Sequence, residues 1–340
     1  MFAKLLTLPY KVAVCSRLWL YEHGWISSKR LPCSVVSVGN LTAGGTGKTP
    51  VTMWVAQYLA GQGKQVAILS RGYKRKSRES FLLVSNGNDI LAGPADAGDE
   101  PFLMAANCPG IIVAVGADRY QLGLWVLEHH KVDCVVLDDG FQHLGLERDL
   151  NLLLIDVTDF TGLKGLLPFG RLREPLSGAK RATGVIYTRA GNADNLEPVR
   201  RMVVSAVGGF VPSIAIQFEA QALVSENGNS REKLSCLQGI SVLIFCGIGN
   251  PSSFRGLVES LGAQVVDEII FSDHMVYTAE AIQHIQKRMD KAKVQICVTT
   301  EKDLVKVKQL QSNLGSVWAL SLGIKFLEGQ ETFEKQLARV

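Results

Sequence analysis

Short apolar runs and helical patterns alternate along the first two thirds of the chain. The apolar runs predict buried strands at residues 33–38, 64–70, 110–115, 133–137, 152–155 and 185–188. Between them, apolar residues recur at the spacing of a helix, as at 49–60 and 119–130. Because strands joined by crossover helices pair side by side, this alternation predicts an α/β fold with a mainly parallel sheet.

A polar stretch at residues 219–233 interrupts this alternation, which then restarts. Further strands are expected at 241–246, 263–270, 295–299 and 317–321, with helices near 253–260 and 278–291. The pattern predicts a first domain over 31–218, a linker over 219–235 and a second, smaller α/β domain over 236–340. The last helix either stays with the second domain or packs back on the first.

The composition is that of a globular enzyme. Of 340 residues, 47% are hydrophobic and 20% are charged, and the length exceeds what one hydrophobic core usually serves. The seven cysteines form no CxxC pair. An odd number without paired spacing argues against a disulfide framework and a zinc knuckle, and favours the cytoplasm.

The net charge of +4 is concentrated at the amino terminus. Residues 1–30 hold five cations against the single acid Glu22, which leaves the rest of the chain neutral. A general nucleic-acid binder would spread its basic residues over a folded domain, so we expect no nucleic-acid partner.

The basic amino-terminal segment also has an amphipathic pattern. Apolar residues recur at helical spacing: Leu5, Leu8, Val12, Cys15 and Trp19. Pro9 is expected in the first turn of this helix. The apolar stretch is interrupted by cations and is too short to cross a bilayer. Two interpretations stay open, a helix that lies on a membrane surface and a helix that packs on the protein's own core.

A glycine-rich segment lies between the first predicted strand and the first long helix. It consists of Thr42, Ala43, Gly44, Gly45, Thr46, Gly47, Lys48 and Thr49. Glycines let backbone N–H groups turn toward phosphate oxygens, and the helix N-terminus adds positive potential. Lys48 is expected to reach the outer phosphates and Thr49 to ligate Mg²⁺. The segment therefore predicts a nucleotide-binding loop and a P-loop NTPase-like fold.

This loop departs from the pattern G-x-x-x-x-G-K-[ST] at one position. Thr42 stands where the pattern has its first glycine. Gly44 and Gly45 supply comparable freedom inside the loop, so we interpret the segment as a variant P-loop. An ordinary glycine-rich turn would explain the glycines but not the Lys48-Thr49 ending.

The apolar run at 132–137 ends in two carboxylates, Asp138 and Asp139. At the carboxyl end of a parallel strand they would face the same crevice as the P-loop, where one can hold Mg²⁺. Asp139 is the first choice and Asp138 the second, with a cap or turn as the alternative. Gln142 and His143 follow, and can ligate metal or position phosphate. The simpler interpretation of His143 is a loop residue satisfied by its neighbours.

Asp99 and Glu100 open a further helical pattern. One interpretation is a helix cap, because carboxylates are favoured at helix starts. The other makes Asp99 the base for an acceptor hydroxyl and places Glu100 near the metal. An aspartate with an ordinary pKa of about 3.9 is a weak base, so a partner such as histidine would help. His274, ahead of a predicted helix, is by itself more typical of a structural histidine.

Together these segments resemble the tetraacyldisaccharide 4′-kinases, the lipid A 4′-kinases, across nearly the whole chain. The resemblance rests on their order and on residues 37–50, 70–73, 98–101, 138–143, 247–251, 273–274 and 300–303. Each segment alone is a weak signal, but the ordered set is highly specific.

The resemblance implies transfer of the γ-phosphoryl group of ATP, with Mg²⁺, to the 4′-hydroxyl of an acylated glucosamine disaccharide 1-phosphate in lipid A biosynthesis. It places the enzyme at the cytoplasmic face of the bacterial inner membrane, peripherally associated. The amino-terminal helix would then contact the membrane surface, where an acylated, anionic substrate is found. The sequence gives no sign of an obligate protein partner.

The resemblance also implies roles for single residues. Asp99 matches the base, assisted by a histidine that matches His274 when the two domains close. Glu100 and Asp139 match acidic positions associated with Mg²⁺, while Lys48 would neutralise phosphate charge during transfer.

Other positions are less directly assigned. Arg71 and Arg119 are candidates for contacts with substrate or the γ-phosphate, with surface ion pairs as the alternative. The chain departs from the family at Met275, where a second histidine is common, which leaves His274 as the candidate.

Two other classes of protein share parts of this pattern. A nucleotide-hydrolysing switch or metallochaperone also uses a variant P-loop, but it would carry a metal-binding cluster, and the sequence has no CxxC or histidine-rich tract. A binding module with a vestigial site would not need Lys48, Thr49 and Asp139 together.

Overall fold

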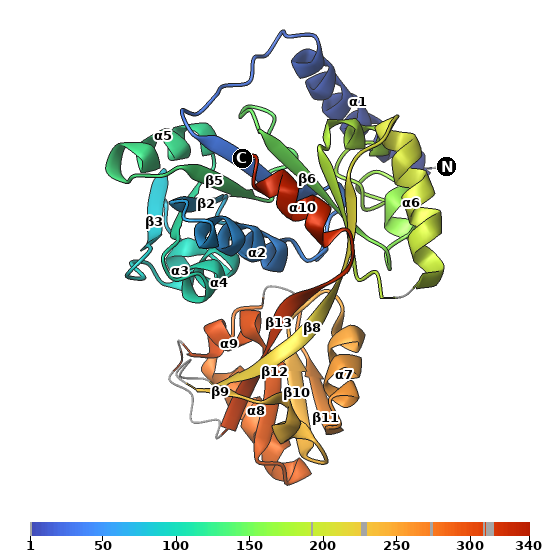
Figure 1. Cartoon of the computed structure of the whole chain (residues 1–340). Helices are drawn as coiled ribbons and strands as arrows, with labels where there is room; N and C mark the ends of the chain where they lie inside the picture. The colour runs from blue at the N-terminus through green and yellow to red at the C-terminus, as the bar shows by residue number, and fades with distance from the viewer. Residues whose placement is uncertain (1, 192, 226–229, 273–274, 309, 311–315) are drawn as a thin grey trace. The chain divides into compact units, whose positions relative to one another are not determined.

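The computed structural model describes all residues except 1, 192, 226–229, 273–274, 309 and 311–315. The chain forms two compact units (Figure 1). The first contains Met1–Phe218 and Ile324–Val340, and the second contains Glu219–Gly323. The chain leaves the first unit along β8 (Ser213–Ser225) and returns along β13 (Ser316–Glu328).

A mostly parallel sheet forms the centre of the first unit. Its strands lie in the order β8, β7 (Gly184–Thr188), β6 (Leu150–Asp156), β1 (Ser34–Asn40), β5 (Cys134–Asp138), β2 (Val66–Ser70), β4 (Ile112–Gly116) and β3 (Phe81–Asn86). The pairs from β8 to β4 are parallel, and β3 runs antiparallel to β4. The prediction of an α/β fold with a mainly parallel sheet is confirmed.

Helices cover both faces of this sheet, because alternate residues of a buried strand point to opposite sides. One face packs against α2 (Lys48–Gly61), α4 (Asp99–Asn107) and α10 (Gln330–Leu337). The other packs against α5 (Arg119–His129) and α6 (Ala193–Val207). Shorter helices are α3 (Pro94–Ala97), η1 (Thr161–Lys164) and η2 (Leu176–Arg181).

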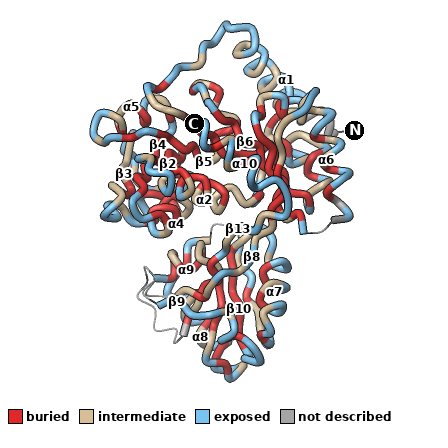
Figure 2. The backbone as a smooth tube through the Cα atoms, viewed as in Figure 1, coloured by how far each residue is buried: buried red, intermediate tan, exposed pale blue. Residues whose placement is uncertain are grey.

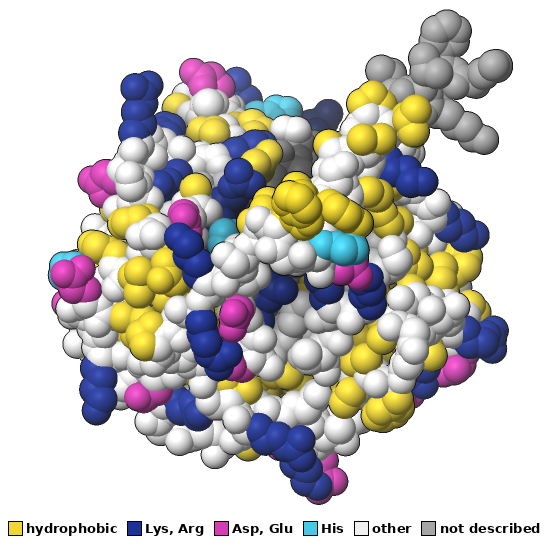
Figure 3. Space-filling model, turned by 90° about the horizontal axis from the view of Figure 1, so that it is seen from above, with side chains coloured by type: hydrophobic (Ala, Val, Ile, Leu, Met, Phe, Trp, Pro, Cys, Tyr) yellow, Lys and Arg dark blue, Asp and Glu magenta, His cyan; other side chains and the backbone are white. Residues whose placement is uncertain are grey.

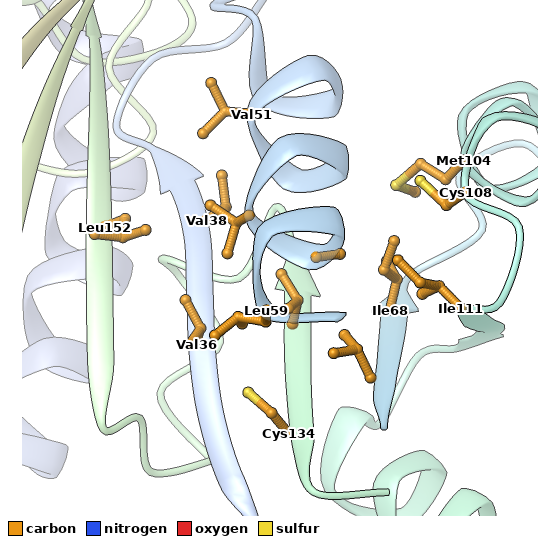
Figure 4. Packing of buried hydrophobic residues seen from close by; sticks show 14 of the residues in the cluster. Val36, Val38, Val51, Leu59, Ile68, Met104, Cys108, Ile111, Cys134 and Leu152 are labelled. Carbon is orange, nitrogen blue, oxygen red and sulfur yellow. The ribbon is translucent and has the colours of Figure 1, made fainter. Parts of the chain in front are cut away.

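The core under α2 fixes the helix that begins at the phosphate loop. Figure 4 shows Val51 and Leu59 of α2 against Val36 and Val38 of β1, all fully or almost fully buried. Burying one large aliphatic side chain contributes about 1.5–3 kcal/mol. The packing therefore holds the N-terminus of α2 against the carboxyl end of β1, where the loop must sit.

The strands of the second unit also have helices on both faces. Its strands lie in the order β11 (Gln264–Ile270), β10 (Ser241–Cys246), β12 (Ile296–Thr300) and β13, and these pairs are parallel. α7 (Pro251–Ser260) packs on one face, and α8 (Ala279–Ala292) with α9 (Glu301–Lys308) on the other. β9 (Arg231–Glu232) and η3 (Leu234–Leu237) lie near its start. Figure 2 shows buried residues concentrated along the strands of each unit.

The division after Phe218 coincides with the expected end of the first domain, whereas residues 219–235 belong to the second unit and are not a separate linker. Residues 219–225, expected within a linker, continue β8, in which exposed and less exposed residues alternate from Glu219 to Ala222. β13 likewise continues to Glu328, beyond the expected 317–321. It carries α10 into the first unit, where Phe333 and Leu337 are buried in the core beneath α2. The polar composition of 219–233 hid a strand whose residues alternate.

The amino-terminal helix α1 spans Phe2–Glu22, so Pro9 lies inside it and not in its first turn. A proline inside a helix removes one backbone hydrogen bond and usually kinks it, but α1 continues through Pro9. From Thr7 onward, where its side chains are described, no residue of α1 is buried. Its environment therefore differs from that of the sheet-covering helices.

Candidate functional site

Polar residues gather where the parallel strands of the first unit end. They are Thr188 and Arg189 at β7, Asp156 at β6, Asn40 and the phosphate loop at β1, Asp138 and Asp139 at β5, Ser70 and Arg71 at β2, and Arg119 after β4. The carboxyl ends of parallel strands meet at one edge of a sheet, where α/β enzymes bind ligands. The register Val38↔Asp138 sets the first acid beside the end of β1, just before the loop begins.

The glycines of the phosphate loop adopt conformations that favour glycine. Gly44 has φ 114° and Gly47 has φ 85°, and Gly47 is the residue from which α2 begins. A side chain at Gly47 would overlap the ring of Phe218. These two glycines let the loop turn sharply into the helix N-terminus.

Thr42 does not need to be glycine. It forms an extended bridge with Leu172, and its φ is not among the positive values. Next to it, the Ala43 N–H donates to the Arg171 carbonyl at 2.6 Å, and the Arg171 Nη2 donates to the Ala43 carbonyl at 2.8 Å. The departure from the usual pattern therefore lies in a segment paired with the 171–172 backbone.

The middle of the loop is held by side chains from β1 and β7. Asn40 Nδ2 donates to the Thr46 hydroxyl at 2.8 Å, and the Thr188 hydroxyl donates to the Thr46 carbonyl at 3.0 Å. Arg189 donates to the Gly45 carbonyl at 3.1 Å and pairs with Asp156. Side chains from β1 and β7 thus fix the conformation of the loop.

The sequence interpretation missed Asp156, Thr188 and Arg189. Asp156 ends an apolar strand as Asp138 does, so the rule that singled out Asp138 would also have found it. Thr188 and Arg189 carried no comparable signal, because hydroxyls and arginines are frequent in loops.

Asp139 is surrounded by cations. Arg173 Nη1 donates to both carboxylate oxygens, at 2.9 and 2.7 Å, and Lys48 Nζ lies 3.8 Å from Oδ1. Burial alone would raise the pKa of Asp139, but the charges of Lys48 and Arg173 outweigh it and lower the pKa. Asp139 is therefore an ionised partner of Lys48 and Arg173.

Asp138 has neutral partners. The Ser70 hydroxyl donates to its Oδ2 at 2.9 Å, and the Thr52 hydroxyl to its Oδ1 at 3.4 Å. Burial, with the negative charges of Glu100 and Asp139, raises the pKa of Asp138 to about 7. A bound cation would therefore stabilise the ionised form of Asp138 more than that of Asp139, which already has cationic partners.

Asp99 and Glu100 are the first two residues of α4 and are half-buried. The capping position belongs to Gly98, with φ 94° and no side chain, and α4 has no side-chain cap hydrogen bond. Asp99 is therefore not the N-cap residue, but both acids lie in the first turn, where carboxylates are favoured, so both interpretations of Asp99 stay open. The negative charge of Glu100 raises the pKa of Asp138, so Glu100 and Asp138 lie near the same edge of the sheet.

Arg119 is not part of a surface ion pair. It is only 6% exposed, and its Nη1 donates to the Ala117 carbonyl at 2.7 Å. The pKa of Arg119 is lowered, because burial and the charge of Arg71 outweigh the opposite effect of the Asp139 and Asp138 charges. Its Nε has no hydrogen-bond partner in the described part of the chain. Arg119 therefore lies close enough to the acids to act at this edge, and Arg71 lies close enough to Arg119 for their charges to interact.

Gln142 braces the loop. Its Nε2 donates to the Asn40 carbonyl at 2.7 Å and to Glu174 at 2.9 Å, and Arg173 Nη1 lies 3.3 Å from its Oε1. Glu174 is buried and pairs with Arg181 at 2.7 Å. The sequence interpretation missed this network, although the charged run at 171–174 in an otherwise apolar loop was a usable signal.

His143 lies in the loop after β5 and is half-buried. Burial, followed by the charge of Arg119, lowers its pKa to about 4, so the ring is neutral near pH 7. Its carbonyl accepts from Arg148 at 2.8 Å. These contacts fit the simpler interpretation of a loop residue among arginines.

In the second unit, the segments 247–251 and 300–303, both part of the family resemblance, are joined by hydrogen bonds. The Gly247 N–H donates to Asp303 Oδ2 at 2.9 Å, and the Thr300 hydroxyl donates to the same oxygen at 2.7 Å. Asp303 is fully buried. His274 lies outside the described residues, so its partnership with Asp99 stays a prediction.

Comparison with known proteins covers the whole chain. Residues 2–340 match the family described as tetraacyldisaccharide-1-P 4′-kinase. Proteins named tetraacyldisaccharide 4′-kinase are 37% identical in Syntrophus aciditrophicus, over 96% of this chain and 89% of that protein, and 37% identical in Geobacter metallireducens, over 95% and 93%.

A solved structure agrees with these matches. A crystal structure of LpxK from Aquifex aeolicus, in complex with ATP, has a TM-score of 0.79 and 34% sequence identity to this chain. The match covers 99% of this chain and 98% of that one. The chain belongs to the tetraacyldisaccharide 4′-kinase family.

Proposed function

We infer that the protein is an ATP-dependent kinase of lipid A biosynthesis, which transfers the γ-phosphoryl group to the 4′-hydroxyl of a tetraacyldisaccharide 1-phosphate. The carrying observation is a match to this family over residues 2–340, in a chain whose phosphate loop and acids share one sheet edge. A nucleotide-hydrolysing switch or metallochaperone is not favoured, because the relatives that match the whole chain are kinases.

ATP binds with its phosphates on the loop from Thr42 to Thr49. The N-terminus of α2 and the loop N–H groups face the phosphates, and Lys48 reaches the β- and γ-phosphates. Support comes from the bracing of the loop by Asn40, Thr188 and Arg189. Arg119, buried near the acids, contributes positive charge that balances the transferring group.

The residues at this edge fit Mg²⁺. In kinases the ion takes one or two carboxylates together with phosphate oxygens, and when bound it neutralises charge on the phosphates. We place Asp138 ahead of Asp139 as the acid facing the ion, because Asp139 already pairs with Arg173 and Lys48. Thr49 and Glu100 complete the candidate ligands.

Asp99 accepts the proton of the 4′-hydroxyl while that oxygen attacks the γ-phosphorus and the bond to the β–γ bridging oxygen breaks. By the family resemblance, His274 is the residue that assists Asp99. The position of Asp99 at the start of α4, beside Glu100, whose charge acts on Asp138 at the strand ends, supports this assignment.

A phosphoryl-transfer assay tests the function. With ³²P in the γ-position of ATP, the label should move to the acylated disaccharide 1-phosphate and only slowly to water. Equal ATP turnover with and without the lipid would instead identify a hydrolase.

The amino-terminal helix α1 binds the cytoplasmic surface of the inner membrane. Large apolar side chains are exposed along it: Leu8 58%, Val12 55% and Trp19 48%. Figure 3 shows hydrophobic side chains on the side of the molecule where α1 lies, with lysine and arginine side chains around them. Within the described residues, no helix is long and apolar enough to span a bilayer. A helix lying in the interface uses this combination of apolar and basic residues.

Removing the apolar face of α1 should weaken membrane binding. We expect the variant Leu8→Ser, Val12→Ser, Trp19→Ser to bind anionic lipid vesicles about tenfold or more weakly in a sedimentation assay, because apolar area no longer enters the interface. The matched control replaces Ile90, Val204 and Phe210, which are also exposed but lie outside α1. Unchanged vesicle binding with reduced solubility would favour the core-helix interpretation.

A further inference from the structure

Residues 71–78, here called the basic loop, follow β2 and carry unusual charge. Five of these residues are cations: Arg71, Lys74, Arg75, Lys76 and Arg78. Arg71 lies at the edge already described, but the rest have no part in ATP binding or proton transfer. The charge of the loop therefore calls for a separate explanation.

The basic loop has a defined conformation. Gly72 and Lys74 both have positive φ, at 69° and 59°, and the Arg75 N–H donates to the Gly72 carbonyl at 3.3 Å. The Lys76 N–H donates to the Ala95 carbonyl at 2.8 Å. The half-buried Arg75 side chain donates to the Val115 carbonyl at 3.4 Å. Arg75 thus serves as the anchor of the loop.

The three other cations of the basic loop beyond Arg71 are exposed to solvent. Lys74, Lys76 and Arg78 are exposed, and none forms an ion pair within the part of the chain that the structure describes. The one acid beside them in sequence is Glu79. Three cations so close in the chain repel one another, and an anion bound between them relieves this repulsion.

The basic loop lies beside the residue proposed as the base. A side chain at Gly98, the residue before Asp99, would meet the Tyr73 carbonyl oxygen at 3.1 Å. A side chain at Gly72 would meet the Ala97 carbonyl oxygen at the same distance of 3.1 Å. The loop main chain therefore packs directly against the turn that opens α4.

We propose that Lys74, Lys76 and Arg78 bind the phosphate that the acceptor already carries, and so select which end of the disaccharide reaches Asp99. This inference rests on the proposed function. The 1-phosphate is on the other sugar ring from the 4′-hydroxyl, so its site must lie near Asp99 but apart from it, and the loop packs against the residues that precede Asp99. Lysine and arginine are the side chains that bind phosphate by charge-assisted hydrogen bonds.

An anionic membrane surface would also attract these cations, but the loop suits the acceptor better. A membrane-binding segment combines basic with apolar residues, as α1 does. The basic loop has Tyr73 as its one large apolar side chain. The basic loop also packs against Gly98, the residue before Asp99, and so lies next to the proposed base.

The test compares two acceptors in nonionic detergent micelles, which present no anionic surface. One is the tetraacyldisaccharide 1-phosphate, and the other is the same disaccharide without its phosphate. In the variant Lys74→Gln, Lys76→Gln, Arg78→Gln, KM for the phosphorylated acceptor should rise about 10- to 100-fold. The preference in kcat/KM for the phosphorylated acceptor should largely disappear, with KM for ATP unchanged.

Two further variants separate charge from folding. Lys74→Arg, Lys76→Arg, Arg78→Lys keeps the charges and should keep the preference. Lys64→Gln, Lys131→Gln, Arg201→Gln removes three cations elsewhere in the first unit, none in an ion pair among the described residues, and should also keep it.

The proposal is overturned if the glutamine variant retains the wild-type preference, or if the control triple loses it equally. It is also overturned if the glutamine variant loses only its affinity for anionic vesicles, which would assign the loop to the membrane. A wild-type enzyme that phosphorylates both acceptors equally would refute the phosphate site and leave the kinase function intact. Transfer to neither acceptor would refute the kinase function itself.

Discussion

Replacing Asp99 with alanine should lower kcat by about 10²- to 10⁴-fold, the range that a positioned general base contributes. The affinity for ATP should change little, because Asp99 lies at the start of α4 and not in the phosphate loop. Single-turnover transfer of ³²P to the acylated disaccharide measures the first quantity, and equilibrium binding of ATP measures the second. A loss confined to kcat is the signature of an interaction made in the transition state.

The matched control is Asp89→Ala, which removes an exposed acid from the turn after β3. It should leave both quantities near the wild-type values. If Asp99→Ala instead weakened ATP binding and preserved kcat, Asp99 would belong with the metal ligands. A comparable loss in thermal stability and activity would point to a purely structural role at the helix start.

Replacing Lys48 with methionine should lower kcat by about 10²- to 10³-fold, as removal of one preorganised positive donor from a developing negative charge does. Methionine keeps most of the length of the side chain and removes the charge. Lys48 is 12% exposed and lies 3.8 Å from Asp139, so its charge acts where water is largely excluded. Binding of ATP should also weaken, because the phosphates lose a cation in the ground state.

Lys64→Met serves as the control for Lys48. Lys64 precedes β2, at the opposite end of the strands from the loop, and this variant should turn over like the wild type. Near-normal kcat in Lys48→Met would mean that another cation, such as Arg173 or Arg119, carries the transferring charge. The structure would then assign Lys48 to the ion pair with Asp139.

The sequence predicted most of the central strands because their apolar runs are short and bounded by turn residues. The prediction missed β3, which runs antiparallel at the edge, and β8, whose alternating residues lie partly in the polar stretch 219–233. Both strands are partly exposed, so they lack the continuous apolar run that marks a buried parallel strand.

The candidate site divides in the same way. Lys48, Asp138 and Asp139 could be found from the sequence because each lies at the end of a strand or the start of a helix, in a local pattern. Arg173 lies 34 residues from Asp139, and Arg189 is 144 residues from Gly45, yet each pair is in contact. No local pattern encodes contacts over such separations.

The sequence by itself determined that a phosphate loop follows β1 and that acids end β5, because chain connectivity and strand direction place both at one sheet edge. Only the tertiary structure decided how the charges divide between the two acids. Arg173 and Lys48 hold Asp139 ionised, while burial and neighbouring acids raise the pKa of Asp138. Electrostatic roles depend on distance and burial in space, which residues far apart in the chain set together.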